Sequence, residues 1–155
     1  APGEENSGKL VNMVREKAKQ VAKENNINTV ILDGPPGIGC PVISTITGVD
    51  KVIIVTEPSI SGLHDMKRTL EIVKKFGTEA FVIINKFDLN PKISRQIDSW
   101  CTNECVHVIG HLPFEPQIVE AMVQGLSINE FDSGLNISKK ISEIWNKIKN
   151  PTPYS

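Results

Sequence analysis

The stretch that decides the fold is "VILDGPPG", Val30 to Gly37. Three apolar residues end in an aspartate, and a turn rich in glycine and proline follows at once. Together with the two residues before it, this short apolar run predicts a buried strand over 28–33 that the turn interrupts.

The same alternation continues along the chain. Apolar runs predict further strands in "KVIIVT", "AFVIIN" and "VHVIG", residues 51–56, 80–85 and 106–110. Helical spacing of apolar residues predicts helices over 7–25, 41–48, 61–76, 91–103, 116–124 and 137–149. Helices that alternate with apolar strands predict an α/β fold, a three-layer parallel sheet of about four strands with helices on both faces. We expect one domain over 1–149 and a disordered tail over 150–155.

Composition narrows the function classes. The chain has 155 residues, of which 39% are hydrophobic and 23% charged, and a net charge of -1. This balance gives no attraction to nucleic acid, and no apolar run approaches the length of about 20 residues that spans a membrane. The polar N-terminus is unlike a signal peptide, and three cysteines favour reduced thiols, so we expect a cytoplasmic protein. Because the chain begins Ala-Pro-Gly, we also expect it to be a piece of a longer protein.

Two strand ends carry candidate chemistry, because ligands of open parallel sheets bind at the carboxyl ends of the strands. Asp33 ends the first predicted strand, where a carboxylate holds Mg²⁺ through a water or else caps a turn. Gly37 offers a bare backbone N–H to a phosphate. "NKFD" follows the third strand, and in such a motif Asn85, Lys86 and Asp88 bind a purine base.

Four stretches then occur in a characteristic order: "ILDGPPGIGCP", "VIIVTEPSISGLHDMKR", "VIINKFDLN" and "HLPFEPQIVEA". Together they resemble the C-terminal part of a MinD/ParA-type P-loop ATPase of the SIMIBI class. The likeness is greatest to the branch with an inserted ferredoxin domain, often labelled cobyrinic acid a,c-diamide synthase-like.

The resemblance implies catalytic roles for Asp33, the Walker B acid that holds Mg²⁺ through a water, and for Gly37, the switch II glycine. It implies that Asn85 contacts adenine, with Lys86 and Asp88 nearby. A second segment would enclose the base from the other side: Leu112, Pro113 and Phe114.

The resemblance also implies cofactors and partners. In the intact protein these are Mg-ATP, a second copy of the chain, and an iron–sulfur or redox protein. Asp65 and Arg68, on the predicted helix 61–76, match a region that faces a dimer partner or another protein. On the residues alone, the same two side chains also fit a solvated helix face.

The stretch "GEENSGKL", Gly3 to Leu10, nearly spells a phosphate-binding loop but departs from the pattern. No strand precedes it, and Leu10 replaces the hydroxyl residue that ligates Mg²⁺. Glu4 and Glu5 would each cost about 1 kcal/mol beside a polyphosphate in water. We therefore expect a switch I-like loop with Ser7 as a helix cap, and a Walker A loop outside this sequence.

We therefore expect the chain to contain only half of a nucleotide-binding site, which we call a half site. It has base-side and Mg²⁺-side residues but lacks the phosphate cradle that supplies most of the affinity for a triphosphate. We expect it to bind ATP weakly or not at all, and not to hydrolyse it, whereas the intact protein would hydrolyse ATP by in-line attack of water.

The cysteines suggest two metal sites. In the related nitrogenase iron protein, a cysteine at the position of Cys40 ligates a [4Fe–4S] cluster, although the favoured role here is that of a small residue packed behind the turn. By the resemblance, the cysteines of a ferredoxin-type [4Fe–4S] cluster would lie in the missing insert. One short stretch contains four residues of the types that bind zinc: Cys101, Cys105, His107 and His111. They are a candidate zinc site, but their spacing differs from that of structural zinc sites.

Three other hypotheses remain. A GTPase-like switch would read guanine through Asn85, Lys86 and Asp88. A non-catalytic interaction module would have lost nucleotide binding. The last predicted helix has an apolar stripe flanked by lysines, which fits attachment to a membrane surface, although packing on the sheet is the favoured role.

Overall fold

The structure, a computed structural model, describes residues 2–35, 37 and 39–150. These residues form two compact units. One comprises Ala1–Val52 and Lys67–Ala80, and the other comprises Ile53–Met66 and Phe81–Ser155. Each unit has its own hydrophobic cluster, and we describe each by itself.

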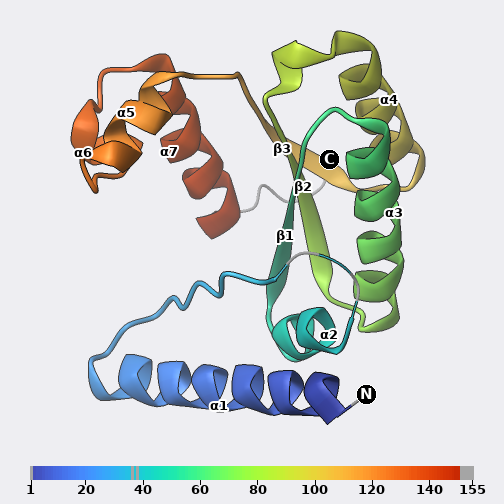
Figure 1. The fold of residues 1–155 in the computed structure, drawn as a ribbon, viewed down its shortest axis with the longest axis vertical. Coiled ribbons are helices and arrows are strands. Elements are labelled where there is room, and N and C mark those ends of the chain that lie inside the picture. The colour runs from blue at the N-terminus through green and yellow to red at the C-terminus, as the bar shows by residue number, and fades with distance from the viewer. Residues whose placement is uncertain (1, 36, 38, 151–155) are drawn as a thin grey trace. The chain divides into compact units, whose positions relative to one another are not determined.

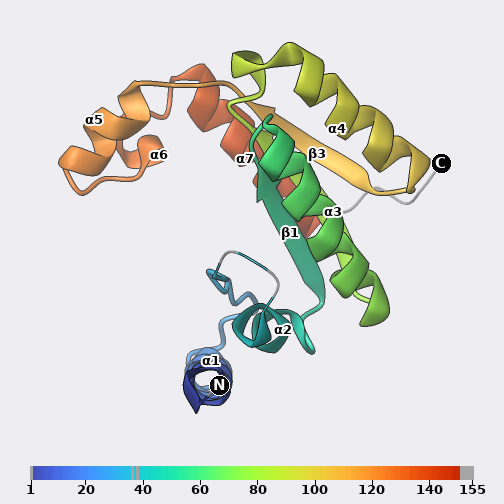
Figure 2. The ribbon, with the colours of Figure 1, turned by 45° about the vertical axis from the view of Figure 1, so that its right-hand side comes forward.

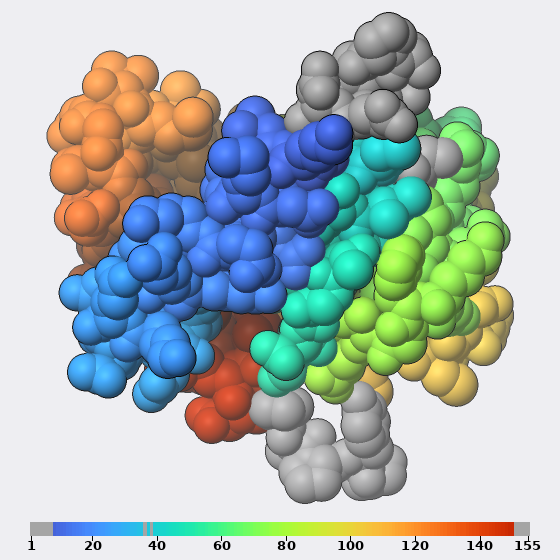
Figure 3. Space-filling view, turned by 90° about the horizontal axis from the view of Figure 1, so that it is seen from below, coloured from blue at the N-terminus to red at the C-terminus, as the bar shows by residue number. Residues whose placement is uncertain are grey.

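Two helices of the first unit, α1 (Pro2–Glu24) and α2 (Cys40–Ile46), lie against each other (Figure 3). The buried positions of α1 recur every seven residues, at Gly8, Arg15 and Ala22, so they share one face of the helix. The guanidinium of Arg15 donates to the carbonyls of Ser44 and Thr47 at the end of α2. Arg15 thereby ties the two helices together.

A three-stranded sheet has the order β1 (Lys51–Thr56), β2 (Glu79–Asn85) and β3 (His107–Leu112). Strands β2 and β3 run parallel, and their register aligns Phe81 with His107 and Asn85 with Leu112. The register shifts between Val82 and Ile83, as at a β-bulge. The predicted parallel α/β sheet is therefore confirmed, with three strands where about four were expected.

Helices cover both faces of this sheet. Helices α4 (Pro91–Asn103) and α7 (Asn136–Lys149) each contact β3, and Figures 1 and 2 show them on opposite faces. On the α7 side, buried residues of β2 and β3 pack against Ile144 of α7. The remaining elements are α3 (Ile60–Lys75), the 3₁₀ helix η1 (Phe87–Leu89), α5 (Gln117–Val123) and α6 (Ile128–Phe131).

The predicted strand over 28–33 is wrong. The backbone of these residues forms no strand, and Val30 and Ile31 are 42% and 76% exposed. Backbone N–H and C=O groups of an extended segment form β-structure only when a neighbouring strand pairs with them. No strand in the described part of the chain does so here.

The predicted switch I-like loop is also wrong. Residues 3–10 lie within α1, so Ser7 is inside the helix and does not cap it. Residues 4–7 contain no glycine or proline. The helix that is formed by the residues after them can therefore continue toward the N-terminus. Of the expected tail, residues 151–155 lie outside the described residues.

Candidate functional site

The ends of all three strands belong to the second unit. Strand β1 ends at Thr56, β2 at Asn85 and β3 at Leu112, and each is followed by a loop that carries polar side chains. Because the strands are parallel, these loops emerge at one edge of the sheet, where open α/β sheets bind their ligands.

An ion pair joins the loops after β1 and β2. Lys86 follows Asn85 in the left-handed conformation, with φ 52° and ψ 40°. Its Nζ lies 2.6 Å from Oε1 of Glu57, and both side chains are partly exposed. Such a pair contributes little stability, and it brings the Lys86 side chain next to the loop after β1. Glu57 lies in "VIIVTEPSISGLHDMKR", one of the stretches that carry the resemblance, but the sequence predicts no role of its own for it.

A hydrogen bond joins the loops after β2 and β3. Oδ1 of Asp88, in η1, accepts from the backbone N–H of Phe114 at 2.8 Å. The alignment of Asn85 with Leu112 brings the two loops next to each other. The structure thus brings the "NKFD" segment and the segment 112–114 together, while their role as nucleotide contacts stays a prediction.

The "NKFD" segment rests on a group of packed side chains. The Phe87 and His111 rings meet edge to face, with centroids 5.7 Å apart. Nε2 of His111 lies 2.9 Å from Oδ1 of Asp98 on α4, and the Ser94 hydroxyl donates to the Phe87 carbonyl at 2.6 Å. These contacts hold the "NKFD" segment on α4 and β3. Sequence reasoning missed them because they join residues that are distant in the chain.

The predicted Mg²⁺-side residues belong to the first unit. Asp33 is exposed in the segment that follows α1. Gly37 is also exposed, with φ 100°, and a Cβ added there would meet no atom within 4 Å. A side chain there would thus meet open space, whereas the positive φ favours glycine. Cys40 is an exposed free thiol at the start of α2.

The predicted partner residues, Asp65 and Arg68, are both exposed on α3. Oδ1 of Asp65 lies 3.4 Å from Nδ1 of its neighbour His64. Their exposure suits a contact with a partner and equally a solvated helix face, so the role implied by the resemblance stays a prediction.

The cysteines and histidines near α4 do not gather into a metal site. Cys101 is fully buried, and its pKa is raised from 9.0 to about 11, chiefly by burial and then by the charge of Asp98. Cys105 is exposed, and His111 bonds to Asp98. Within the described ranges, no three His, Cys, Asp or Glu side chains could hold a metal ion together.

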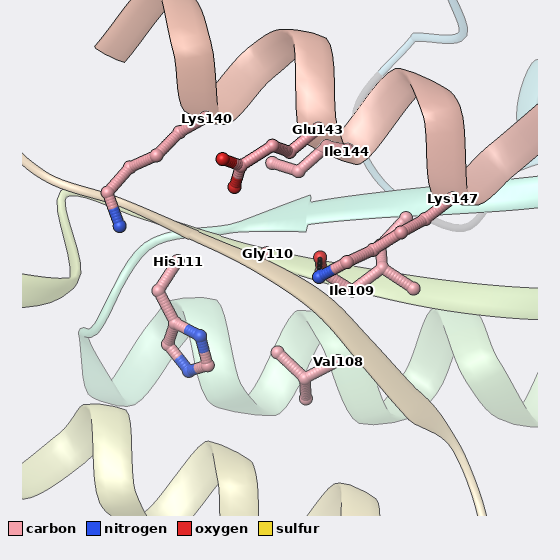
Figure 4. A pocket seen from close by; sticks show the side chains of 8 residues that line it. All are labelled: Val108, Ile109, Gly110, His111, Lys140, Glu143, Ile144 and Lys147. Carbon is pink, nitrogen blue, oxygen red and sulfur yellow. Dashed lines mark hydrogen bonds between the residues drawn. The ribbon is translucent and has the colours of Figure 1, made fainter. Parts of the chain in front are cut away.

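A pocket of about 190 Å³ lies between α7 and β3, and His111 of β3 is among the residues that line it (Figure 4). Lys140, Glu143 and Lys147 of α7 line it. Nζ of Lys147 donates to the Ile109 carbonyl at 3.0 Å, so this lysine occupies an acceptor of β3. One residue of its lining, His111, also contacts Phe87 of the "NKFD" segment.

No described helix is both long enough and apolar enough to cross a bilayer. The last predicted helix, α7, instead packs on the sheet through Ile144, which is buried against residues of β2 and β3. This is the favoured role that the sequence predicted for it.

Comparisons with known proteins agree with this architecture. An uncharacterized protein of Methanocaldococcus jannaschii is 29% identical over 147 residues, which are 95% of this chain and 48% of that protein. The structure of the MinD cell division protein of Aquifex aeolicus superposes with a TM-score of 0.73 at 18% identity, over 90% of this chain and 60% of that one. MinD of Pyrococcus horikoshii, solved with Mg-ADP, gives a TM-score of 0.64 at 20% identity, over 76% of this chain and 49% of that one.

The chain thus spans about half the length of the curated relatives it matches. The structural likeness, at such low identity, shows the fold. A family model, that of the NUBPL iron-transfer P-loop NTPase, matches residues 7–149. This match covers nearly the whole sequence, so the chain belongs to the ParA family of P-loop NTPases.

Proposed function

We propose that this chain provides the base-side and Mg²⁺-side residues of an ATP site in a MinD/ParA-like ATPase. The observation that carries the proposal is the bond between Asp88 and the Phe114 N–H, which joins the two predicted base-side loops. Asn85 then binds the edge of adenine, while Leu112, Pro113 and Phe114 enclose the ring from the side of β3. Lys86, held by Glu57, lies beside it.

The hydrogen bond that Asp88 makes to the Phe114 N–H favours adenine over guanine as the bound base. In the GTPase-like alternative, this carboxylate would accept from the N–H groups of guanine. Here one of its oxygens already accepts from the backbone of the neighbouring loop, which gives Asp88 a structural task. A side chain that holds the loop is less free to select guanine.

Asp33 and Gly37 supply the phosphate side of the proposed site. The exposed Asp33 carboxylate suits Mg²⁺, which keeps several waters and takes one or two carboxylates plus phosphate oxygens. The open Gly37 backbone suits close approach of a phosphate oxygen. Mg²⁺ would supply charge stabilisation during in-line attack of water on the γ-phosphate.

The phosphate cradle belongs, in this proposal, to the remaining half of the relatives' length. Residues 3–10 are helical, so this stretch does not present backbone N–H groups to a phosphate as a loop would. We therefore infer that the chain alone binds Mg-ATP weakly and does not hydrolyse it.

The link to iron is a further part of the proposal, supported by the description of the family model. Exposed Asp65 and Arg68 on α3 would face a second copy of the chain or an iron–sulfur partner. The described residues themselves do not fit a [4Fe–4S] cluster, because such a cluster needs four thiolates and no described ligand residues gather into a group that could hold a metal ion. A cluster would lie in an insert, as in the cobyrinic acid diamide synthase-like branch.

The experiment is titration calorimetry with Mg-ATP and Mg-GTP on this chain and on a protein of the relatives' full length that contains it. We expect tight Mg-ATP binding by the long protein only, and at least about tenfold weaker binding after Asn85→Ala. Asn103→Ala, at the exposed end of α4, is the matched control. A preference for Mg-GTP would support the alternative, and micromolar Mg-ATP binding by this chain would overturn the half-site proposal.

A further inference from the structure

Helix α5 presents an apolar face to solvent. Val119, Met122 and Val123 are 60%, 70% and 83% exposed. At about 100° per residue, these three positions lie within an arc of about 100° on the helix. Ala121, on the opposite side, is only 1% exposed. The inner side of α5 is therefore packed, whereas its outer side has no partner among the described residues.

The local structure holds this face in place. Gly125, with φ 70°, ends the helix, and the Leu126 N–H bonds back to the Ala121 carbonyl at 3.0 Å. The next helix, α6, begins with a capping box between Ser127 and Glu130 and packs on α5 (Figure 1). The three apolar side chains thus project from a fixed helix and not from a loop.

The charged residues of the chain segment that carries this face all have one sign. Residues 112–138 contain four acidic side chains and no lysine, arginine or histidine. The acids are Glu115, Glu120, Glu130 and Asp132. Hydrogen bonds from the hydroxyl and then the backbone of Ser127 lower the pKa of Glu130, which keeps that carboxylate ionised. Because the net charge of the chain is only -1, this acidity is local.

We propose that this α5 face docks a basic amphipathic helix of a partner protein. The apolar side of such a helix would cover Val119, Met122 and Val123, and its lysines and arginines would meet the surrounding carboxylates. Met122 adapts its shape to the residues that it meets. The acidic segment disfavours two other occupants, the same face of a second copy and an anionic membrane, because both would bring like charges together.

The proposal goes beyond the nucleotide site, and its test uses no nucleotide. The probe is a fluorescent synthetic helix of about five turns with leucine on one face and lysine elsewhere, and its binding is followed by anisotropy. A matched peptide carries glutamate in place of lysine. We expect the lysine peptide to bind at least about tenfold more tightly, and its affinity to fall as salt rises.

Variants locate the binding surface. We expect Met122→Asp to weaken binding of the lysine peptide by about tenfold or more. Ile60→Asp, at the equally exposed Ile60 of α3, is the control and should bind as the wild type does. Circular dichroism and urea unfolding check that both variants fold. Equal binding by both variants, or equal binding of the glutamate peptide, would overturn the proposal.

Two measurements exclude the competing occupants. Sedimentation that shows a dimer in the wild type and a monomer in Met122→Asp would assign the face to a second copy. In the full natural protein, purified from its own cells, Met122 should react with peroxide as readily as an exposed methionine does. Resistance of Met122 there would mean that another part of the same protein covers the face, and either result overturns the proposal.

Discussion

At the scale of single residues, Asp88 decides how two loops are held. Its carboxylate accepts from the Phe114 N–H across 26 positions of sequence. A hydrogen bond to a charged group contributes more than a neutral one, but this group is exposed and water can replace it in part. The bond therefore matters less for global stability than for the position of the loop after β3.

We expect Asp88→Ala to lower the free energy of unfolding by about 1 kcal/mol and to speed hydrogen exchange at the Phe114 amide. Asp88→Asn keeps an acceptor oxygen and should retain most of the protection. Urea unfolding and exchange measured by NMR test both statements. If alanine and asparagine left the Phe114 amide equally protected, Asp88 would not hold this loop.

Cys101 makes stability depend on alkaline pH. Burial raises the pKa of its thiol from 9.0 to about 11, so in the folded protein the neutral thiol is favoured. In the unfolded chain the thiol ionises near pH 9. The stabilisation is therefore complete below pH 9 and is lost as the pH rises through 11.

We expect the wild type to lose more stability between pH 8 and pH 10.5 than Cys101→Ala does, as measured by urea unfolding. Cys105→Ala, at an exposed thiol, is the matched control and should behave as the wild type does. A thiol reagent at pH 8 should modify Cys40 and Cys105 quickly and Cys101 only after unfolding. Parallel losses in the wild type and Cys101→Ala would contradict this account.

The sequence predicted residues of the candidate site only where they belong to a short motif at the end of a strand. Asn85 and Asp88 lie in a short motif at a strand end, and that is visible in the sequence. The pairing of Lys86 with Glu57 and of His111 with Asp98 depends on side chains that the sheet brings together from distant positions. No spacing rule in one sequence identifies such pairs.

At the scale of elements, the contact between β3 and α7 depends on a glycine, Gly110, which has no side chain to keep the helix away. A Cβ added at Gly110 would lie 2.2 Å from Cδ1 and 2.5 Å from Cγ1 of Ile144. Glycine is needed here because of the close approach of the helix. Ile144 belongs to the hydrophobic cluster of the second unit, so the helix cannot withdraw without exposing that cluster.

We expect Gly110→Ala to cost about 1–3 kcal/mol of unfolding free energy, because the added methyl overfills the contact. Ile144→Val removes Cδ1 and should alone cost about 0.5–1.5 kcal/mol. The double variant should lose less than the sum of the two, which a double-mutant cycle in urea measures. Gly39→Ala is the control, because its Cβ would meet only an ordinary contact at 3.6 Å. Additive losses would show that the two residues do not press on each other.

The secondary structure shows where sequence patterns suffice. Strand β1 and helix α4 have the bounds that their apolar patterns and a proline start predict. The run over 28–33 has an equally apolar pattern, but it forms no strand. Apolar character indicates that a segment is suited to burial in a sheet, whereas strand formation also needs a neighbour to pair with.

At the scale of the whole molecule, several apolar side chains are exposed in a chain that spans about half the length of its relatives. Ile27, Val30 and Ile31 lie exposed in one segment of the first unit, and Leu10, Met13 and Val14 lie exposed on α1. Clusters of exposed apolar side chains mark surfaces that other chain segments cover. We infer that the segment 28–33 becomes a strand when the remaining half of the relatives' length is present.

Hydrogen exchange tests this inference directly. In this chain, the backbone amides of residues 29–32 have no strand to bond to, so they should exchange about as fast as in an unfolded peptide. In a protein of the relatives' full length that contains this sequence, the same amides should be protected at least about a hundredfold, because ladder hydrogen bonds must open before exchange. The amides of Val82 and Ile84 in β2 are the internal control and should be protected in both proteins. Fast exchange at 29–32 in the long protein would mean that "VILD" is a loop in the complete fold, and Asp33 would then lack the strand end from which it is proposed to meet Mg²⁺.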